Sequence, residues 1–66
     1  MKQWKSVNEV LDFAIKNEEE ARNFYYDLAT KMKKQAMAKV FEGFAQEEQG
    51  HKEKLLRVKE AGGFEF

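Results

Sequence analysis

Residues 40–55 read VFEGFAQEEQGHKEKL, and the pattern of this stretch decides the fold. Apolar side chains recur in it at steps of three and four, and the same spacing extends from Met37 to Val58. This period is typical of one helix face that packs against other helices. Two positions on the face are polar: they hold Glu48 and His51, the only histidine of the chain. The pattern therefore places a carboxylate and an imidazole where apolar side chains are expected.

The first half of the chain carries a matching helix face. Ser6 is followed three residues later by Glu9, which is the pattern of a capping box with Ser6 as the N-cap. Glu18 takes one position of the face that follows. The other positions, again at steps of three and four, are apolar: Val7, Leu11, Ala14, Ala21, Tyr25, Leu28 and Met32.

These patterns predict one all-α domain. The chain has no proline, and its four glycines all come after residue 42, so long helices are favoured. We expect an antiparallel two-helix hairpin that dimerises into a four-helix bundle. The expected single domain covers residues 1–66, with a helix over about 6–33, a turn at about 33–36, a helix over about 36–60 and a short tail at 61–66.

Composition excludes several classes of protein. A chain of 66 residues buries little of its own surface, and it has no cysteine for disulfides, thiolate-ligated zinc or iron–sulfur clusters. Its 12 basic and 12 acidic residues balance, so we expect no nucleic-acid partner. The sequence has neither a signal peptide nor an apolar run of membrane-spanning length, which predicts a cytoplasmic protein without a membrane partner.

The antiparallel hairpin brings the polar positions to one level. Glu18 lies about 16 residues before the middle of the turn, and Glu48 and His51 lie about 14 to 17 residues after it. At about 1.5 Å per residue, all three lie about 22 to 25 Å from the turn. Carboxylates among apolar side chains cost several kcal/mol unless a cation compensates for their charge.

The residues alone allow two sources of that cation. A metal ion can be held jointly by Glu48 and His51, which are three residues apart on one helix face, together with Glu18. Alternatively, Arg22 lies one turn from Glu18 and can form a buried Glu–Arg–His network that fixes the register of the hairpin. The remaining acidic residues are interpreted as solvated helix faces, chiefly Glu19, Glu20, Glu42, Glu53 and Glu60.

One hairpin holds half of a known ligand set. Di-iron carboxylate bundles take one Glu from each of two helices and a Glu-x-x-His from each of the other two, and this chain has one of each. A two-fold dimer supplies four carboxylates and two imidazoles, enough for two metal ions. It also covers the helix faces that a lone hairpin leaves wet, so we expect a homodimer or higher homo-oligomer.

The stretches AIKNEEEARNFYYDLA, residues 14–29, and VFEGFAQEEQGHKEKL resemble the two helices of one half of a ferritin-like protein of the rubrerythrin group. The resemblance places Glu18, Glu48 and His51 at the metal-ligand positions of that family. Tyr25 is similar to the tyrosine that often lies near its iron sites.

Full-length members of the family carry two such helix pairs, whereas this chain has one, as encapsulated ferritins do. The tail GGFEF resembles the segment that leads to a second half, so the chain is either a half-length member or part of a longer protein. The closing residues 64–66 are expected either to pack on a partner or to begin a further segment.

The resemblance implies an oxidoreductase with two Fe ions per dimer, for which Mn or Zn are alternatives. It implies that the protein oxidises Fe(II) with O2 as a ferroxidase, or reduces hydrogen peroxide as a peroxidase. Glu48 is expected to bridge the metals, with Glu18 and His51 as terminal ligands, and Tyr25 either donates a hydrogen bond or an electron or fills the core. Without a cysteine-ligated rubredoxin domain, an external electron donor is expected. The alternatives are a metal-binding module without turnover and a purely structural dimerisation hairpin.

Overall fold

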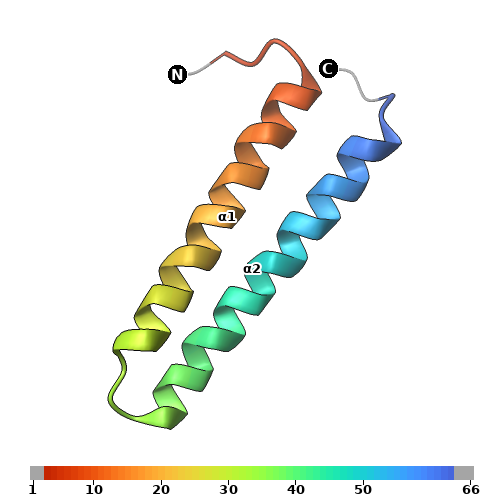
Figure 1. The fold of residues 1–66 in the computed structure, drawn as a ribbon. Helices are drawn as coiled ribbons and strands as arrows, with labels where there is room; N and C mark the ends of the chain where they lie inside the picture. The colour runs from red at the N-terminus through yellow and green to blue at the C-terminus, as the bar shows by residue number, and fades with distance from the viewer. Residues whose placement is uncertain (1–2, 64–66) are drawn as a thin grey trace.

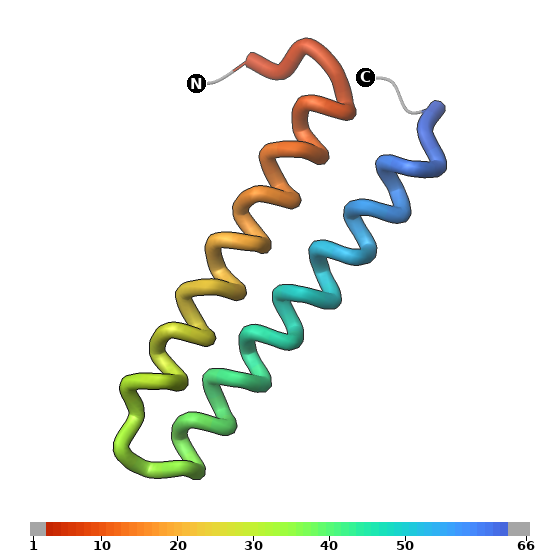
Figure 2. Tube along the Cα trace, in the orientation of Figure 1, coloured from red at the N-terminus to blue at the C-terminus, as the bar shows by residue number. Residues whose placement is uncertain are grey.

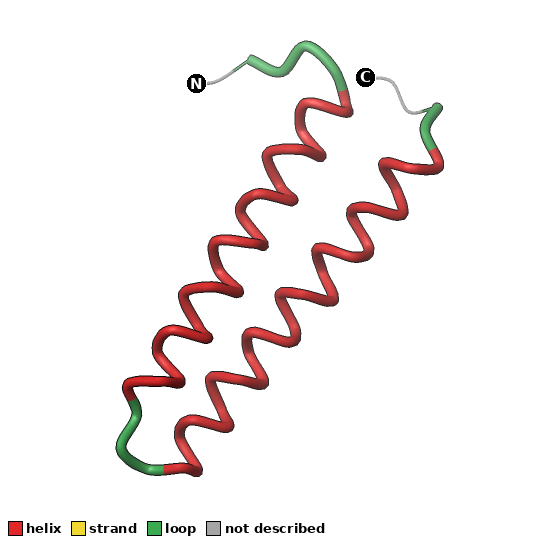
Figure 3. The backbone as a smooth tube through the Cα atoms, viewed as in Figure 1, coloured by secondary structure: helices red, strands yellow, loops and turns green. Residues whose placement is uncertain are grey.

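The computed structural model describes residues 3–63, and in this range it consists of two antiparallel α-helices and no strand (Figure 1). Helix α1 comprises Val7–Lys31 and helix α2 comprises Gln35–Ala61. The short segment 32–34 joins them, beginning one residue and ending two residues before the expected turn at 33–36 (Figure 3). The prediction of an all-α helical hairpin is confirmed, while the closing residues 64–66 lie outside the described part of the chain.

The start of α1 is fixed by Ser6, as its sequence predicts. The backbone N–H of Glu9 donates to Oγ of Ser6 at 3.1 Å. The carboxylate of Glu9 accepts from the backbone N–H of Lys5 at 3.3 Å, one residue before the position that a standard capping box uses. At the other end, Met32 is extended and its N–H donates to the carbonyl of Ala29, which stops the helix.

Helix α2 has a weak start and a firm end. Its N-cap, Lys34, contributes no side-chain hydrogen bond, and the N–H groups of Met37 and Ala38 both donate to the Lys34 carbonyl at 3.1 Å. Gly62 ends the helix at φ 67°, a left-handed conformation that glycine adopts without a steric cost. The helix-stop signal in the sequence therefore acts where it was expected.

The core of the hairpin is thin. The described residues contain four buried apolar side chains, Leu11, Ile15 and Ala29 on α1 and Ala45 on α2. The Cα atoms span only 11 Å in the thinnest direction, and the two helices lie side by side in a single layer (Figure 2). A single layer cannot cover both of its faces, so most large apolar side chains stay accessible to water.

An aromatic cluster joins the helices near the turn. The ring of Tyr25 stacks on Phe41 at a centroid distance of 6.3 Å and meets Phe44 edge-on at 5.4 Å. Phe24 makes a further edge contact with Tyr25 at 5.5 Å. Such aromatic pairs contribute about 0.5–1.5 kcal/mol each beyond the area they bury, so this cluster stabilises the half of the hairpin that is nearer the turn.

Ion pairs close one side of the hairpin. Lys59 pairs with Asp12, and Lys52 pairs with Glu19 at 3.0 Å. Asp12 and Glu19 are seven residues apart on α1, and Lys52 and Lys59 are seven apart on α2, so the two pairs repeat along one side. We call this side, defined by these four residues, the ionic edge.

Exposed apolar side chains occupy other parts of both helices. Phe24 is the most exposed, at 59%, and we use the name apolar face for this residue together with four of α2: Met37, Val40, Phe44 and Val58. Phe13 is also exposed, but its ring packs against Trp4 at 5.1 Å. Neither of the helices in residues 3–63 combines the length and the apolar character that crossing a membrane requires.

Candidate metal centre

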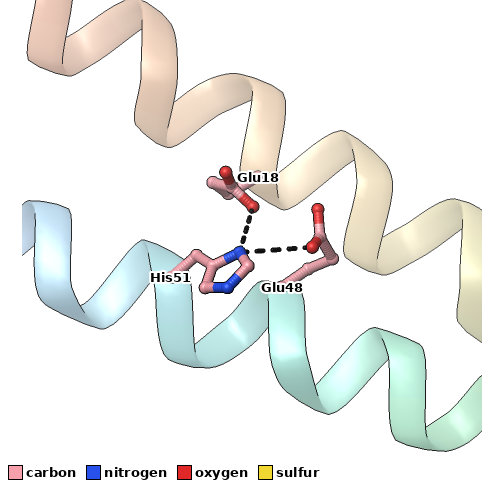
Figure 4. A group of neighbouring side chains, drawn as sticks. All are labelled: Glu18, Glu48 and His51. Carbon is pink, nitrogen blue, oxygen red and sulfur yellow. Dashed lines mark ion pairs between the residues drawn. The ribbon is translucent and has the colours of Figure 1, made fainter.

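The three predicted ligands meet between the helices. Helix α1 supplies Glu18, and α2 supplies Glu48 and His51 from successive turns of one face (Figure 4). Nδ1 of His51 lies 3.4 Å from Oε2 of Glu18 and 3.3 Å from Oε1 of Glu48. One donor atom from each side chain lies within 4.8 Å of the other two. The structure thus brings these residues together, while their role as metal ligands stays a prediction.

Glu18 gives the clearest reason to expect a cation at this site. Its Oε2 atom is buried and has no hydrogen-bond partner among the described residues. The nearby Nδ1 of His51 stands at ion-pair distance, but the contact lacks the geometry of a hydrogen bond. A buried acceptor left unsatisfied costs about 1–3 kcal/mol, and more when it is charged. A metal ion between the three donors would satisfy this oxygen.

The two carboxyl groups also act on each other. The pKa of Glu48 is raised, chiefly because its carboxyl group can share a hydrogen bond with that of Glu18 when one of them is protonated. Partial burial and the negative charge of Glu18 raise this pKa further, and His51 opposes them. Two carboxylates held this close favour a bound cation, since a cation removes the repulsion between them.

Arg22 is directed elsewhere. It donates from Nη1 to Oε1 of Gln49, and from Nε and Nη2 to Oδ1 of Asn23 at 3.3 and 3.2 Å. The ion pairs of the described residues include no contact between Arg22 and Glu18. In this structure Arg22 therefore does not neutralise Glu18, and the alternative Glu–Arg–His network is not formed.

The ionic edge was missed by the sequence interpretation, which left Glu19 on a solvated face. The Lys52 ammonium donates a hydrogen bond to the Glu19 carboxylate, and this bond, followed by the Lys52 charge, lowers the pKa of Glu19. The repeated spacing of seven residues between Asp12 and Glu19, and between Lys52 and Lys59, was the signal that could have revealed it. Neither of its ion pairs includes one of the three donors, so any effect of the ionic edge on the site is indirect.

Tyr25 lies outside the group of three donors. Its contacts are with the rings of Phe24, Phe41 and Phe44. It follows Glu18 by seven residues, which corresponds to about 10 Å along the helix axis. A direct part in the chemistry is therefore still a prediction, and the structure places the residue in the aromatic cluster.

The donor set defines a class of site. Two carboxylates and one imidazole suit iron, manganese or zinc, and three donors leave coordination positions open. The hairpin has a Glu on one helix and Glu-x-x-His on the other, which matches half of the ligand set that di-iron carboxylate bundles use.

Comparison with known proteins identifies the family. The family model described as Rubrerythrin matches residues 9–64, and the chain therefore belongs to the rubrerythrin family. No curated protein and no solved structure matches the chain. Rubrerythrins typically bind iron, and membership of the family supports di-iron binding and oligomerisation.

Proposed function

We propose that two chains together form a non-haem di-iron centre, with two ions per dimer, that oxidises Fe(II) with O2 or reduces hydrogen peroxide. The observation that carries the proposal is the group of three donors between the helices, in which Oε2 of Glu18 is buried without a hydrogen-bond partner. Membership of the rubrerythrin family supports iron as the metal. Manganese and zinc fit the same donors.

The donor count supports a site shared by two chains. One hairpin offers two carboxylates and one imidazole, which is half of the set that di-iron bundles use. His51 is 56% exposed as a side chain, whereas the two glutamates are less than a quarter exposed. The open side of the site is therefore the side of the imidazole, where a second hairpin can add its own donors.

Each side chain has a defined part in this proposal. Glu48 would be the ligand shared by the two ions, because it lies beside both Glu18 and His51, and those two would be terminal ligands. Glutamates can change between one- and two-oxygen binding as the charge on the site changes. Iron bound there would supply the one-electron redox chemistry. Tyr25 donates a hydrogen bond or an electron to the site or serves only as core, and an external donor supplies electrons for peroxide reduction.

An anaerobic Fe(II) titration of the metal-free chain tests the proposal. We expect saturation near one ion per chain, with dimer formation in sedimentation experiments saturating at the same ratio. His51→Leu should abolish the saturable iron binding, whereas Glu42→Gln, which changes an exposed carboxylate of the same helix, should leave it unchanged. Absence of saturable binding in the unmodified chain would contradict the proposal.

Turnover is tested separately on the iron-loaded chain. Rapid consumption of O2 or hydrogen peroxide, lost in His51→Leu and kept in Glu42→Gln, is the expected result. Iron binding without consumption of either oxidant would reduce the function to that of a metal-binding module. Tyr25→Phe distinguishes the two roles of the tyrosine, because it removes only the hydroxyl group and keeps the ring contacts of the aromatic cluster.

A further inference from the structure

Arg22 and Gln49 join the two helices by a hydrogen bond beside the three donors. Nη1 of Arg22 donates to Oε1 of Gln49, and both side chains are half-buried. Nε and Nη2 of the same guanidinium donate to Oδ1 of Asn23. The Gln49 amide in turn donates from Nε2 to Oε2 of Glu53 at 3.1 Å. We use the name amide bridge for these four residues.

The two central residues of the amide bridge are close neighbours of predicted ligands. Arg22 follows Glu18 by four residues, which corresponds to about 6 Å along the axis of α1 and about 40° around it. Gln49 directly follows Glu48 on α2. A change in the spacing or rotation of either helix at the bridge therefore moves a donor oxygen of the candidate metal centre.

The amide bridge and the imidazole lie on different sides of α2. Gln49 precedes His51 by two residues, which places them about 160° apart around the helix axis. The side chain of His51 is 56% exposed, whereas Gln49 is half-buried and bonded to α1. The candidate metal centre is therefore open on the side of His51 and bridged on the side of Gln49.

The bridge lies where the apolar core contributes little. The buried apolar side chains of the described residues lie farther from the turn, at Leu11 and Ile15, or nearer to it, at Ala29 and Ala45. No side chain is buried between Ile15 and Ala29 on α1, or after Ala45 in the described part of α2. The spacing of the helices around the three donors therefore depends strongly on polar contacts.

The amide bridge is better suited to fix this spacing than the lysine pair near it. The guanidinium of Arg22 is planar, its donors point in fixed directions, and both ends of the Gln49 amide are used. Lys52 contacts Glu19 through a single ammonium on a flexible stem. The arginine bond therefore restricts both the distance and the rotation of the helices.

The acceptors of Arg22 are amides, so the bridge does not occupy the carboxylates of the site. The ion pairs of the described residues include none with Arg22. An arginine paired with Glu18 would occupy the carboxylate that a metal ion needs, because guanidinium–carboxylate bonds are among the strong ones. The observed partners leave both Glu18 and Glu48 available to a cation.

We propose that Arg22 and Gln49 are positioning residues of the metal site, whose hydrogen bond holds the two helices so that the three donors fit one ion. The inference rests on the proposed metal site and adds residues that do not touch the ion. Such a site needs its donors within about 0.5 Å of the productive geometry. Changes in residues that orient ligands typically lower metal affinity about 10–100-fold.

Titration of the full chain with Co²⁺, whose visible absorption depends on ligand geometry, tests the proposal. Gln49→Leu should weaken Co²⁺ binding about tenfold or more and should change the absorption spectrum of the saturated chain. Gln49→Glu keeps an acceptor for Arg22 and should keep the spectrum. The matched control is Gln46→Leu, the same change at an exposed position of α2, which should alter neither the affinity nor the spectrum.

Arg22→Lys is a second, milder variant, so a folding defect of Gln49→Leu does not decide the outcome. It keeps the charge and loses the planar set of donors, and it should change the spectrum of bound Co²⁺ as well. Circular dichroism before addition of Co²⁺ measures the helix content of each variant. A purely structural role would lower the stability of the metal-free chain and leave the spectrum at saturation unchanged, which would overturn the proposal.

The unmodified chain separates this inference from the proposed function. If it binds Co²⁺ and the spectra of Gln49→Leu and Arg22→Lys match its own, the positioning role is wrong and the metal site stands. If it binds no Co²⁺, the metal site and the positioning role are both wrong. An equal change of spectrum in Gln46→Leu would also overturn the positioning role, because that residue lies outside the amide bridge.

Discussion

The ionic edge and the apolar face are parts of one thin hairpin, yet they satisfy their side chains in opposite ways. On the ionic edge, Asp12 pairs with Lys59 and Glu19 pairs with Lys52, and these side chains keep contact with water. On the apolar face, Phe24 and Val40 cannot form ion pairs, and they stay exposed to water. The charged side chains of the ionic edge find their partners within one chain, whereas the apolar face can be buried only by a second layer of helices.

The candidate metal centre has properties of both regions. Its residues are polar, as on the ionic edge, but Glu48 and His51 follow Phe44 on one face of α2. Unlike Asp12 and Glu19, the carboxylates of Glu18 and Glu48 have no lysine or arginine paired with them among the described residues. Among the described residues only the imidazole of His51 lies at ion-pair distance from them, so two carboxylates share one weak base.

The largest effect on dimer stability is expected when a lysine is introduced on the apolar face and compared with a lysine on the side of the ionic edge. Phe24→Lys should weaken the dimer about a hundredfold or more, because an unpaired ammonium in an interface costs several kcal/mol. Tyr26→Lys, two residues away on the side of the ionic edge, should leave the dimer unchanged. Sedimentation equilibrium of the metal-loaded chains measures both. Equal loss of dimer in the two variants would mean that the apolar face has no special part in assembly.

Most of the fold and the close approach of the three predicted ligands could be predicted from the sequence, because both depend on the spacing of residues along the chain. Steps of three and four defined the helix faces, and an antiparallel turn then fixed the heights of Glu18, Glu48 and His51. The turn was less predictable, since the segment around Lys34 has no glycine, proline or side-chain cap to mark it.

Pairing of long side chains could not be derived in the same way. Arg22 can reach several acceptors from one backbone position, and its choice of Gln49 and Asn23 over Glu18 depends on rotamers that spacing does not determine. Lys52 likewise reaches across to Glu19 from a half-buried position. The backbone level of the site followed from the sequence, whereas its electrostatic partners required the structure.

The next effect in size concerns the metal-free chain and its pH dependence. The raised pKa of Glu48 means that the folded chain binds this proton more tightly than the unfolded chain does. The free energy of unfolding should therefore fall as pH rises from the ordinary value of 4.5 through the raised pKa. Glu48→Gln should remove this fall and leave the metal-free chain more stable than the unmodified chain at neutral pH.

Chemical denaturation at several pH values, with a chelator present and at one protein concentration, measures this slope. Glu42→Gln serves as the control, because its carboxylate is exposed on the same helix. A slope that Glu48→Gln leaves unchanged would show that Glu18 does not act on Glu48 in the folded chain.

The smallest expected effect concerns Glu19 on the ionic edge, where the pH dependence of stability has the opposite sign to that of Glu48. The pKa of Glu19 is lowered, so its stabilising contribution is present above the ordinary value of 4.5 and is lost as pH falls through the lowered pKa. Glu19→Gln should lower stability slightly at neutral pH, because an exposed ion pair contributes little.

High salt should remove most of the difference that Glu19→Gln makes, because ions screen an exposed pair. The neighbouring exposed residue provides the control, Glu20→Gln, and denaturation at low and high salt measures both. A loss of stability that persists in high salt would mean that Lys52 holds Glu19 in a setting closed to water. The expected result is two carboxylates in one hairpin with opposite pH slopes, because Glu19 lies beside the ammonium of Lys52 and Glu48 lies beside the carboxyl group of Glu18.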